Sequence, residues 1–274
     1  MTLKRRIVGT LTNLGLIELV NETRGLATLA APSVLLGNAG YRLRGGSDGL
    51  RIPPSRLIYL VAGTYNIDWF LTLGRRAHKA ITDALERNAI DPAKFDAILD
   101  FGCGCGRVIR SFANLDGVDV HGCDYNARLI DWCDKRLSFA TFNSNQLTPP
   151  LPYPDNKFDL AYALSVFTHW GQDYQFAWID EMRRVIKPGG HLLMTTHGAS
   201  YRPTLSDEEG AAFDADQLVV RRAHLAGKNI CTTFYTERYV RDHLTRGCQV
   251  VDFVPQGAKG NPTQDLYLLR FDGP

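Results

Sequence analysis

A run of glycines and cysteines at residues 100–107, D-F-G-C-G-C-G-R, is the part of the 274-residue sequence that points most directly to chemistry. An apolar segment precedes it and another follows it, which is typical of a turn between a strand and a helix. Such a turn lets the backbone approach a ligand closely, and the start of the helix offers N–H groups without partners. The run therefore suits a nucleotide-binding turn, a pair of thiols for metal or redox chemistry, or a tight loop.

The spacing of the glycines excludes two common nucleotide sites. A dinucleotide-binding turn has the pattern G-x-G-x-x-G, but its last glycine position falls on Arg107 when counted from Gly102 and on Ile109 when counted from Gly104. A phosphate-binding loop ends in Gly-Lys-Ser/Thr, which this run lacks. What remains is an acidic residue, one further residue and then G-x-G-x-G.

The cysteines do not have the spacing of a metal or redox site. Cys103 and Cys105 have no second pair of ligands at a zinc-site distance, and redox pairs have the spacing C-x-x-C. We expect no secretory leader and no paired framework among the six cysteines, and hence reduced thiols in a cytoplasmic protein without a bound metal. The two thiols are interpreted as small side chains that fit a crowded turn.

Strand and helix patterns alternate after residue 94 and indicate how the turn is positioned. Short apolar strands alternating with helices are typical of a mostly parallel sheet that is covered on both faces. We expect strands at 95–102, 118–125, 158–166, 191–198, 248–255 and 265–271. We expect helices at 65–89 (one or two), 106–115, 127–137, 175–187 and 236–247, and a loop at 25–57.

Polar residues end four of the expected strands, and ligands bind at the carboxyl ends of strands in such sheets. These residues are Asp100, Asp124, Ser165 and His197. A carboxylate accepts two hydrogen bonds from a diol, and an imidazole has the pKa of a general base near neutral pH. The four residues are therefore the first candidates for a site.

The turn and Asp124 together resemble motifs of the class I S-adenosylmethionine-dependent methyltransferases, in particular the type 11/25 group. Asp124 lies 24 residues after Asp100, where that family places the acid that binds the ribose. Residues 151–170 and 178–198, with their P-G-G turn, are similar to later motifs of the family. The likeness covers roughly residues 92–200. It implies a Rossmann-like, mostly parallel α/β sheet of seven strands with an antiparallel C-terminal hairpin, helices on both faces and an N-terminal helical extension.

The resemblance implies two parts: a methyltransferase domain at residues 91–274 and, at 1–90, a helical and loop extension that caps the pocket. Residues 198–233 exceed a routine connection, so we expect a lid or a substrate-recognition insert there. Near the N-terminus, apolar residues follow helical spacing in a context too polar to span a bilayer. We favour their packing on the protein's own core over contact with a membrane surface. They are Ile7, Leu11, Leu14 and Ile17.

The resemblance also assigns contacts to the cofactor S-adenosylmethionine, whose product is S-adenosylhomocysteine. The turn would lie along the methionine part, Asp100 would hold the amino group, and Asp124 would hold the ribose, with Tyr125 beside the adenine. The turn residues are Gly102, Cys103, Gly104 and Gly106. The other implied contacts are Asn145 and Gln146 at the adenine edge, Leu164 and Ser165 past the fourth strand, and Tyr65 at the carboxylate. Tyr65 equally suits an aromatic side chain packed on the sheet.

Two histidines are candidates for catalysis. Methyl transfer from a sulfonium is an in-line displacement, so the protein mainly aligns the acceptor, and a hydroxyl acceptor gains from a general base. We expect His197 to be that base, because the end of the fifth strand borders the acceptor pocket in this family. We expect His169 to shape the cofactor pocket. A hydrogen-bonded structural histidine is the alternative for each.

These features predict an S-adenosylmethionine-dependent methyltransferase that acts on oxygen in a hydroxylated small molecule or glycan. The alternatives are methylation of nitrogen or of a macromolecule, and a non-catalytic cofactor-binding module. A net charge of +2, with no basic run longer than K-R-R, counts against nucleic acid. The oligomeric state stays open. Further candidates near the acceptor are Tyr201, Arg202, Tyr235, His224 and Gln264.

Overall fold

The computed structural model describes residues 32–227, 230–245, 247–260 and 262–272. The chain consists of two compact units, residues 1–72 and residues 73–274. The N-terminal residues that we expect to form an amphipathic helix, from Ile7 to Ile17, lie outside the described residues. None of the described helices is both long enough and apolar enough to cross a membrane.

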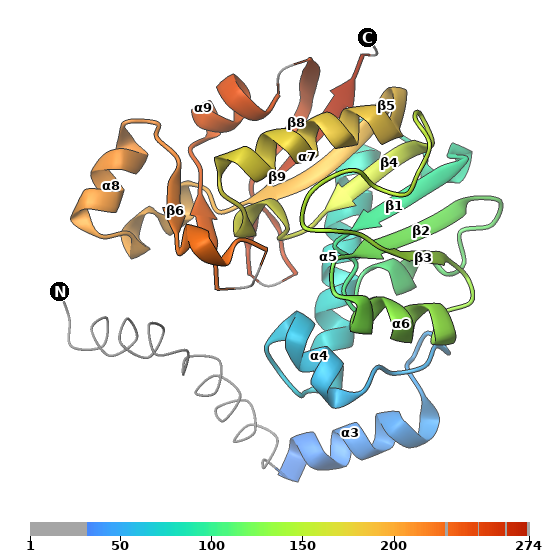
Figure 1. Cartoon of the computed structure of the whole chain (residues 1–274). Coiled ribbons are helices and arrows are strands. Elements are labelled where there is room, and N and C mark those ends of the chain that lie inside the picture. The colour runs from blue at the N-terminus through green and yellow to red at the C-terminus, as the bar shows by residue number, and fades with distance from the viewer. Residues whose placement is uncertain (1–31, 228–229, 246, 261, 273–274) are drawn as a thin grey trace. The chain divides into compact units, whose positions relative to one another are not determined.

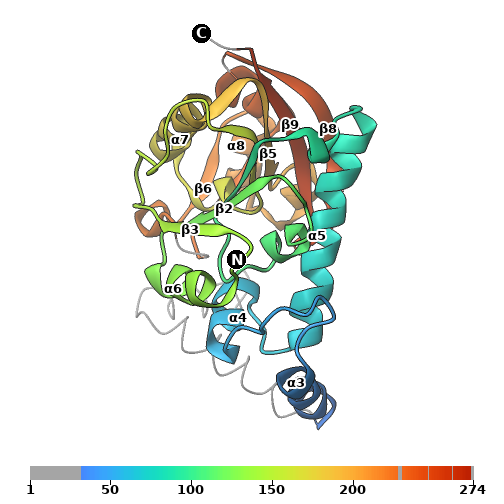
Figure 2. The same cartoon turned by 90° about the vertical axis from the view of Figure 1, so that its right-hand side faces the viewer.

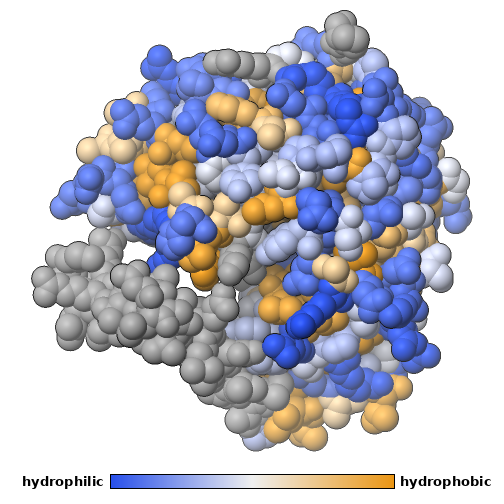
Figure 3. All heavy atoms as spheres, viewed as in Figure 1, coloured by the Kyte–Doolittle hydropathy of each residue, from blue (hydrophilic) through white to orange (hydrophobic). Residues whose placement is uncertain are grey.

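The described part of the first unit is helical. It contains α3 (Pro32–Arg44), α4 (Ser55–Ala62) and the beginning of α5 (Ile67–Arg87). The expectation of a loop at 25–57 is wrong for α3. This helix buries none of its residues, so its sequence carries little apolar periodicity to reveal it. Leu36 and Leu43 are strongly exposed on it, and Figure 3 shows hydrophobic surface over this helix.

The side chain of Asn38 ties α3 to the start of α5 within the first unit. Its Nδ2 donates a hydrogen bond to the carbonyl oxygen of Tyr65 (2.9 Å), and its Oδ1 accepts one from the backbone nitrogen of Ile67 (3.0 Å). The Tyr65 ring stacks on Tyr59, with 4.7 Å between ring centroids. Tyr65 is buried.

The second unit is built around a seven-stranded sheet with the order β3-β2-β1-β4-β5-β9-β8 (Figure 1). The first five strands in this order run parallel, and β9 and β8 add an antiparallel hairpin. This sheet confirms the predicted Rossmann-like architecture. Its strands are β1 (Ala97–Phe101), β2 (Asp119–Asp124), β3 (Thr141–Ser144), β4 (Phe158–Ala163), β5 (Ile186–Thr196), β8 (Cys248–Ala258) and β9 (Gln264–Phe271).

Helices cover both faces of this sheet. Figure 2 shows α7 (Gln172–Val185) and α5, from Leu73 onward, on opposite faces. Trp178 and Met182 of α7 are fully buried against the strands, in the same cluster as α9 (Glu237–Tyr239) and its π-helical continuation Val240–Leu244. α6 (Ala127–Arg136) follows β2 and is capped by Asn126, whose side chain accepts a hydrogen bond from the backbone of Arg128. Burial of these apolar faces positions the strand ends.

The predicted helix at 106–115 is wrong. The chain instead forms turns and a single 3₁₀ segment, Ile109–Phe112. Gly106 has φ +80°, outside the right-handed helical region, and Gly117 has φ +79°. The ten residues between these two glycines therefore close i to i+3 hydrogen bonds, such as that from Ser111 to Val108 (3.0 Å), rather than a regular helix.

Residues 198–227 and 230–234, which correspond to the expected insert at 198–233, form a layer beside the end of β5. They contain a 3₁₀ segment (Ala199–Thr204), α8 (Asp207–Asp214) and β6 (Val219–Arg221), which pairs with β7 (Thr232–Phe234) in an antiparallel hairpin. A capping box between Ser206 and Glu209 begins α8. The layer has its own apolar cluster, made of Leu205, Phe213, Val219 and Phe234.

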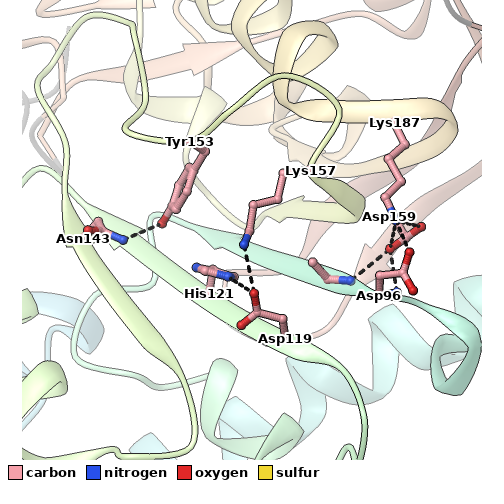
Figure 4. A network of polar contacts seen from close by, with 9 residues as sticks. Asp96, Asp119, His121, Asn143, Tyr153, Lys157, Asp159 and Lys187 are labelled. Carbon is pink, nitrogen blue, oxygen red and sulfur yellow. Dashed lines mark hydrogen bonds and ion pairs between the residues drawn. The ribbon is translucent and has the colours of Figure 1, made fainter.

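Ion pairs join the amino ends of the parallel strands, at the edge opposite the predicted site (Figure 4). Lys157 pairs with Asp119 (2.9 Å), which also contacts His121 (2.7 Å). Lys187 pairs with Asp159 (2.9 Å), whose carboxylate also accepts hydrogen bonds from the backbone nitrogens of residues 96 and 97. These contacts fix the register of the strands and leave the carboxyl ends for other groups.

Gly74 of α5 packs against the backbone that follows the glycine turn, so a larger residue there should destabilise the second unit. A Cβ atom at this position would overlap the carbonyl oxygen of Arg107. We expect Gly74→Ala to lower the free energy of unfolding by about 1–3 kcal/mol through overpacking, although alanine is the better helix former. Gly37→Ala, in α3, is the matched control because no atom lies within 4 Å of its Cβ position. Denaturant unfolding checks this; equal midpoints for the two variants would contradict it.

Candidate active site

The glycine turn is held on the end of β2 by two backbone hydrogen bonds. The N–H groups of Gly102 and Cys103 both donate to the carbonyl oxygen of Cys123, at 2.8 and 3.0 Å. Gly102 and Gly104 have φ +83° and +57°, a region that favours glycine. A Cβ atom on Gly102 would also lie 2.5 Å from Cγ2 of Val166. The G-x-G-x-G spacing is therefore required by the shape of the turn itself.

The carboxylate of Asp124 completes the turn from β2. Its Oδ2 accepts a hydrogen bond from the backbone nitrogen of Gly104 (3.0 Å), and its Oδ1 accepts one from that of Asn126 (2.8 Å). Burial raises the pKa of Asp124, against the effect of these two N–H donors. A carboxylate has about four acceptor sites, so two remain for a diol. Asp124 thus shapes the turn and keeps the capacity that its predicted ribose role requires.

Asp100, at the end of β1, is buried, and one oxygen of its carboxyl group lacks a hydrogen-bond partner among the described residues. Its side chain is 4% exposed, and this oxygen is Oδ2. Burial raises its pKa to about 7, although the hydroxyl of Tyr162 and the guanidinium of Arg107 act in the opposite direction. A carboxyl group in this state gains an ionic partner when an ammonium group binds beside it. This arrangement is compatible with the predicted contact between Asp100 and the cofactor amino group.

Four buried thiols surround the turn. Those of Cys103 and Cys133 both donate to the carbonyl oxygen of Gly104, at 3.7 and 3.6 Å. Burial raises the pKa of the Cys103, Cys105 and Cys123 thiols well above the ordinary value, so these groups are protonated. Protonated thiols are poor metal ligands and poor nucleophiles. Among the residues with described placement, no group of histidine, cysteine and acidic side chains is arranged to hold a metal ion.

The residues predicted to contact adenine lie beside Asp124. Tyr125 is 49% exposed directly after it, and the backbone nitrogen of Asn145 donates to the carbonyl oxygen of Asp124 (3.2 Å). The side-chain Nδ2 of Asn145 donates to the carbonyl oxygen of Gln146 (2.7 Å), while its buried Oδ1 has no partner in the described part of the chain. The Gln146 side chain is exposed. Asn145 therefore offers the better placed acceptor at this edge.

Tyr65 belongs to the first unit, and its predicted contact with the cofactor carboxylate stays a prediction. Leu164 and Ser165 follow β4, and both are partly buried. Ser165 has φ +60°, an unusual conformation for a residue with a side chain, and its backbone nitrogen donates to Oγ1 of Thr195 (2.8 Å). This hydrogen bond holds the end of β4 on the end of β5.

The two predicted catalytic histidines are hydrogen-bonded inside the protein. Nδ1 of His169 contacts the carbonyl oxygen of Cys231 (2.7 Å), and burial lowers its pKa. His197 is 5% exposed; its Nδ1 contacts the carbonyl oxygen of Thr233 (3.1 Å), and its Nε2 contacts the amide nitrogen of Gln264 (3.0 Å). Burial lowers the pKa of His197 to about 4. At neutral pH its imidazole is uncharged, and both ring nitrogens have protein partners.

Three threonines at this edge were missed by sequence reasoning: Thr168, Thr195 and Thr233 are all fully buried beside these histidines. For Thr195 the sequence signal was a polar pair, T-T, at the end of an otherwise apolar strand. Away from this edge, a hollow of about 470 Å³ lies where β5 begins and β9 ends, with His191 and Arg270 in its lining. None of the predicted site residues lines that hollow.

Comparison with known proteins shows similarity to several methyltransferases. Over 163 residues the chain is 31% identical to a ubiquinone/menaquinone biosynthesis C-methyltransferase of Neisseria meningitidis, covering 55% of this chain and 61% of the relative. Over 159 residues it is 23% identical to a tRNA N(3)-cytidine methyltransferase of Gallus gallus, covering 54% and 41%. A solved S-adenosylmethionine dependent methyltransferase from Mesorhizobium loti has a TM-score of 0.53 and 19% identity, covering 70% of this chain and 97% of that structure.

The sheet order and the glycine turn between β1 and β2 thus give this chain the Rossmann-like fold of the class I S-adenosylmethionine-dependent methyltransferases. Residues 99–194 match the family model described as a methyltransferase domain, in line with the resemblance found in the sequence. The chain spans less than two thirds of each of these two curated relatives.

Removing the charge of Asp124 should weaken cofactor binding. In Asp124→Asn the side chain keeps its size and one acceptor oxygen but loses the charge that strengthens hydrogen bonds from a ribose diol. We expect the affinity for S-adenosylmethionine to fall by about 1.5–3 kcal/mol, the range for hydrogen bonds to a charged group. Isothermal titration calorimetry measures this. An unchanged affinity would remove Asp124 from the ribose role, and Asp131→Asn, on the exposed side of α6, controls for the change in charge.

Cofactor affinity should depend on pH through Asp100. Because its pKa is about 7, the carboxyl group is ionised above that pH and protonated below it, and an ammonium group prefers the ionised form. The affinity for S-adenosylmethionine should therefore be highest above pH 7. It should fall by up to about tenfold per pH unit below it, the limit for one proton. Asp100→Asn should abolish this dependence. A wild-type affinity that stays constant between about pH 5.5 and 7.5 would contradict the assignment.

Proposed function

We propose that this domain transfers the methyl group of S-adenosylmethionine to a hydroxyl oxygen of a small molecule or glycan. The observation that carries the choice of oxygen is the uncharged imidazole of His197 at the carboxyl end of β5. A neutral imidazole can take the proton that a hydroxyl group loses, and it does not repel the cationic sulfonium. Its neighbour Ser165 lies at the end of β4, where the family resemblance places cofactor contacts.

The chemistry requires alignment more than activation. The bond between sulfur and the methyl carbon breaks, its electron pair stays on sulfur, and a new bond forms between the acceptor oxygen and the methyl carbon. The hydroxyl proton leaves to a base. Asp100, the glycine turn and Asp124 would hold the cofactor in place, which provides the orientation that an in-line displacement needs. S-adenosylmethionine supplies the activated methyl group.

Methylation of nitrogen is the second candidate, and a specific observation favours it. The Nε2 lone pair of His197 is occupied by the amide of Gln264 (3.0 Å), and a pKa of about 4 makes this imidazole a weak base. A neutral amine acceptor carries its own lone pair and needs no base for the attack. For a base role, the acceptor hydroxyl would have to replace the amide of Gln264 at Nε2.

The identity of the acceptor is open to macromolecules as well. The Neisseria relative is named for carbon methylation in quinone biosynthesis, and the Gallus relative for nitrogen methylation in a tRNA. The expectation that excluded nucleic acid rested on the weak net charge, and the tRNA-modifying relative leaves that exclusion unsupported. Incubation of the full chain with methyl-labelled S-adenosylmethionine and separate pools of hydroxylated small molecules, glycans, amines and tRNA would find the acceptor class. Absence of cofactor binding at millimolar concentration would reject methyl transfer to any of these acceptors.

Substitution of His197 separates the oxygen and nitrogen candidates. His197→Asn keeps an N–H donor for the carbonyl oxygen of Thr233 but lacks Nε2. If His197 is the base, turnover should fall by about 10²–10⁴-fold, the usual contribution of a general base, with little change in cofactor affinity. His243→Asn, in the π-helical segment that follows α9, is the matched control. Wild-type turnover in His197→Asn would reject the role of His197 as the general base and would favour an acceptor that needs no base.

A further inference from the structure

A small hydrogen-bonded cluster joins the ends of three strands beneath the predicted reaction site. Thr195 and His197 come from the end of β5, Ser165 from the end of β4, and Gln264 from the start of β9. Thr195, Gln264 and His197 are each at most 5% exposed. The amide of Gln264 is central, because its oxygen and nitrogen contact all three of the other side chains.

At the β4 end of the cluster, a backbone N–H group determines which atom donates in each hydrogen bond. The backbone nitrogen of Ser165 can only donate, and it donates to Oγ1 of Thr195 (2.8 Å). The hydroxyl proton of Thr195 is therefore free to point to Oε1 of Gln264 (2.6 Å). This bond orients the amide, since it leaves Nε2 of Gln264, with two protons, facing the other two partners.

At the β7 end, a backbone carbonyl group independently determines the direction of the hydrogen bonds. The carbonyl oxygen of Thr233 can only accept, so Nδ1 of His197, 3.1 Å away, carries the proton. In a neutral ring Nε2 then holds the lone pair, and it faces Nε2 of Gln264 at 3.0 Å. The second proton of the amide points to Oγ of Ser165 (2.9 Å). Both ends of the cluster require the same orientation of Gln264.

We propose that Gln264 is a positioning residue that keeps His197 in the uncharged Nδ1–H tautomer and links it to Ser165. An amide N–H can donate to the lone pair of Nε2 but cannot accept a proton from it, so protonation of the ring would break this contact. The role rests on the proposed function, in which an uncharged imidazole lies close to a cationic sulfonium. One side chain of β9 thereby connects the expected cofactor side of the site, at β4, with the expected acceptor side, at β5.

The groups packed around His197 support the same charge state. The titratable side chains nearest to it are His169, Tyr201, whose ring centroid is 4.4 Å away, and Asp265, whose carboxylate fills the space beside Gly198. Burial shifts the pKa of each of these three groups toward its uncharged form. In addition, the hydrogen-bond partner of Nε2 is the amide of Gln264 and not a carboxylate, so no negative charge favours a protonated ring there.

Gln264→Glu reverses the polarity of the contact and tests the role directly. A carboxylate at this position accepts a hydrogen bond from Nε2–H, so the pKa of His197 should rise above its ordinary value of 6.5. Nitrogen-15 and carbon-13 NMR of histidine-labelled full chain, without cofactor, reports the tautomer and the pKa. The wild type should show one Nδ1–H tautomer that does not titrate above pH 5. Gln249→Glu, an exposed position on β8, is the matched control and should leave His197 unchanged.

Thr195→Val tests the same arrangement if the glutamate variant does not fold. Loss of the hydroxyl group releases Oε1 of Gln264, so the amide can rotate and place this acceptor at Nε2 of His197. Because the carbonyl oxygen of Thr233 still keeps a proton on Nδ1, both ring nitrogens then face acceptors, and the pKa of His197 should rise. A wild-type tautomer and pKa in both variants, or wild-type His197 found as the Nε2–H tautomer, would overturn the role. The NMR result does not depend on catalysis, so it stands or falls separately from the proposed function.

Kinetics then connect the role to methyl transfer. In Gln264→Glu, kcat should fall as the pH drops through the raised pKa of His197, while KM for the cofactor changes little. The wild type should keep its kcat over that range. A shifted NMR pKa with an unshifted pH profile of kcat would retain the positioning of His197 and reject its use as a base. An unshifted NMR pKa would reject the positioning role itself.

Discussion

The carboxylate of Asp124 accepts hydrogen bonds from the backbone nitrogens of Gly104 and Asn126. The arrangement of the site at the carboxyl ends of the parallel strands depends on these two contacts. The first gives the glycine turn its shape, and the second starts the segment that leads into α6. Together with the two N–H groups that donate to the carbonyl oxygen of Cys123, they fix β1 and β2 as one unit. A buried charge that satisfies backbone donors on both sides is costly to move, so this part of the site is preorganised.

The two edges of the sheet are stabilised by different physics. At the amino ends, charged side chains pair in partly exposed positions, as in the contacts of Lys157 and Lys187. At the carboxyl ends of β4 and β5, the buried histidines are uncharged, and hydrogen bonds that include the amide of Gln264 join the side chains there. An uncharged set of groups suits a site for a cationic cofactor, because a positively charged side chain there would repel the sulfonium.

Much of the fold could be predicted from the sequence because its signals are local. Buried parallel strands are short apolar runs, and the acids that end β1 and β2 follow them directly, so Asp100 and Asp124 could be placed at one edge. The turns after Gly106 could not be predicted, since that segment is too short for a regular helix. The helix α3 could not be predicted either, since it buries no residue. The contacts of Gln264 are the least predictable, because they join residues 99, 69 and 67 positions apart in the chain. No spacing rule encodes such pairs.

The layer at residues 198–233 has a consequence for how this protein can change over evolutionary time. Its apolar cluster of Leu205, Phe213, Val219 and Phe234 is built from its own residues and from the strand that leads out of it. It meets the site through the ring of Tyr201, whose centroid lies 4.4 Å from that of His197, and through the carbonyl oxygen of Thr233, which contacts Nδ1 of His197 (3.1 Å). Side chains of the layer that lie away from these contacts can therefore diverge with little effect on the sheet. Such a division allows one inherited cofactor site to be combined with new surfaces for recognition.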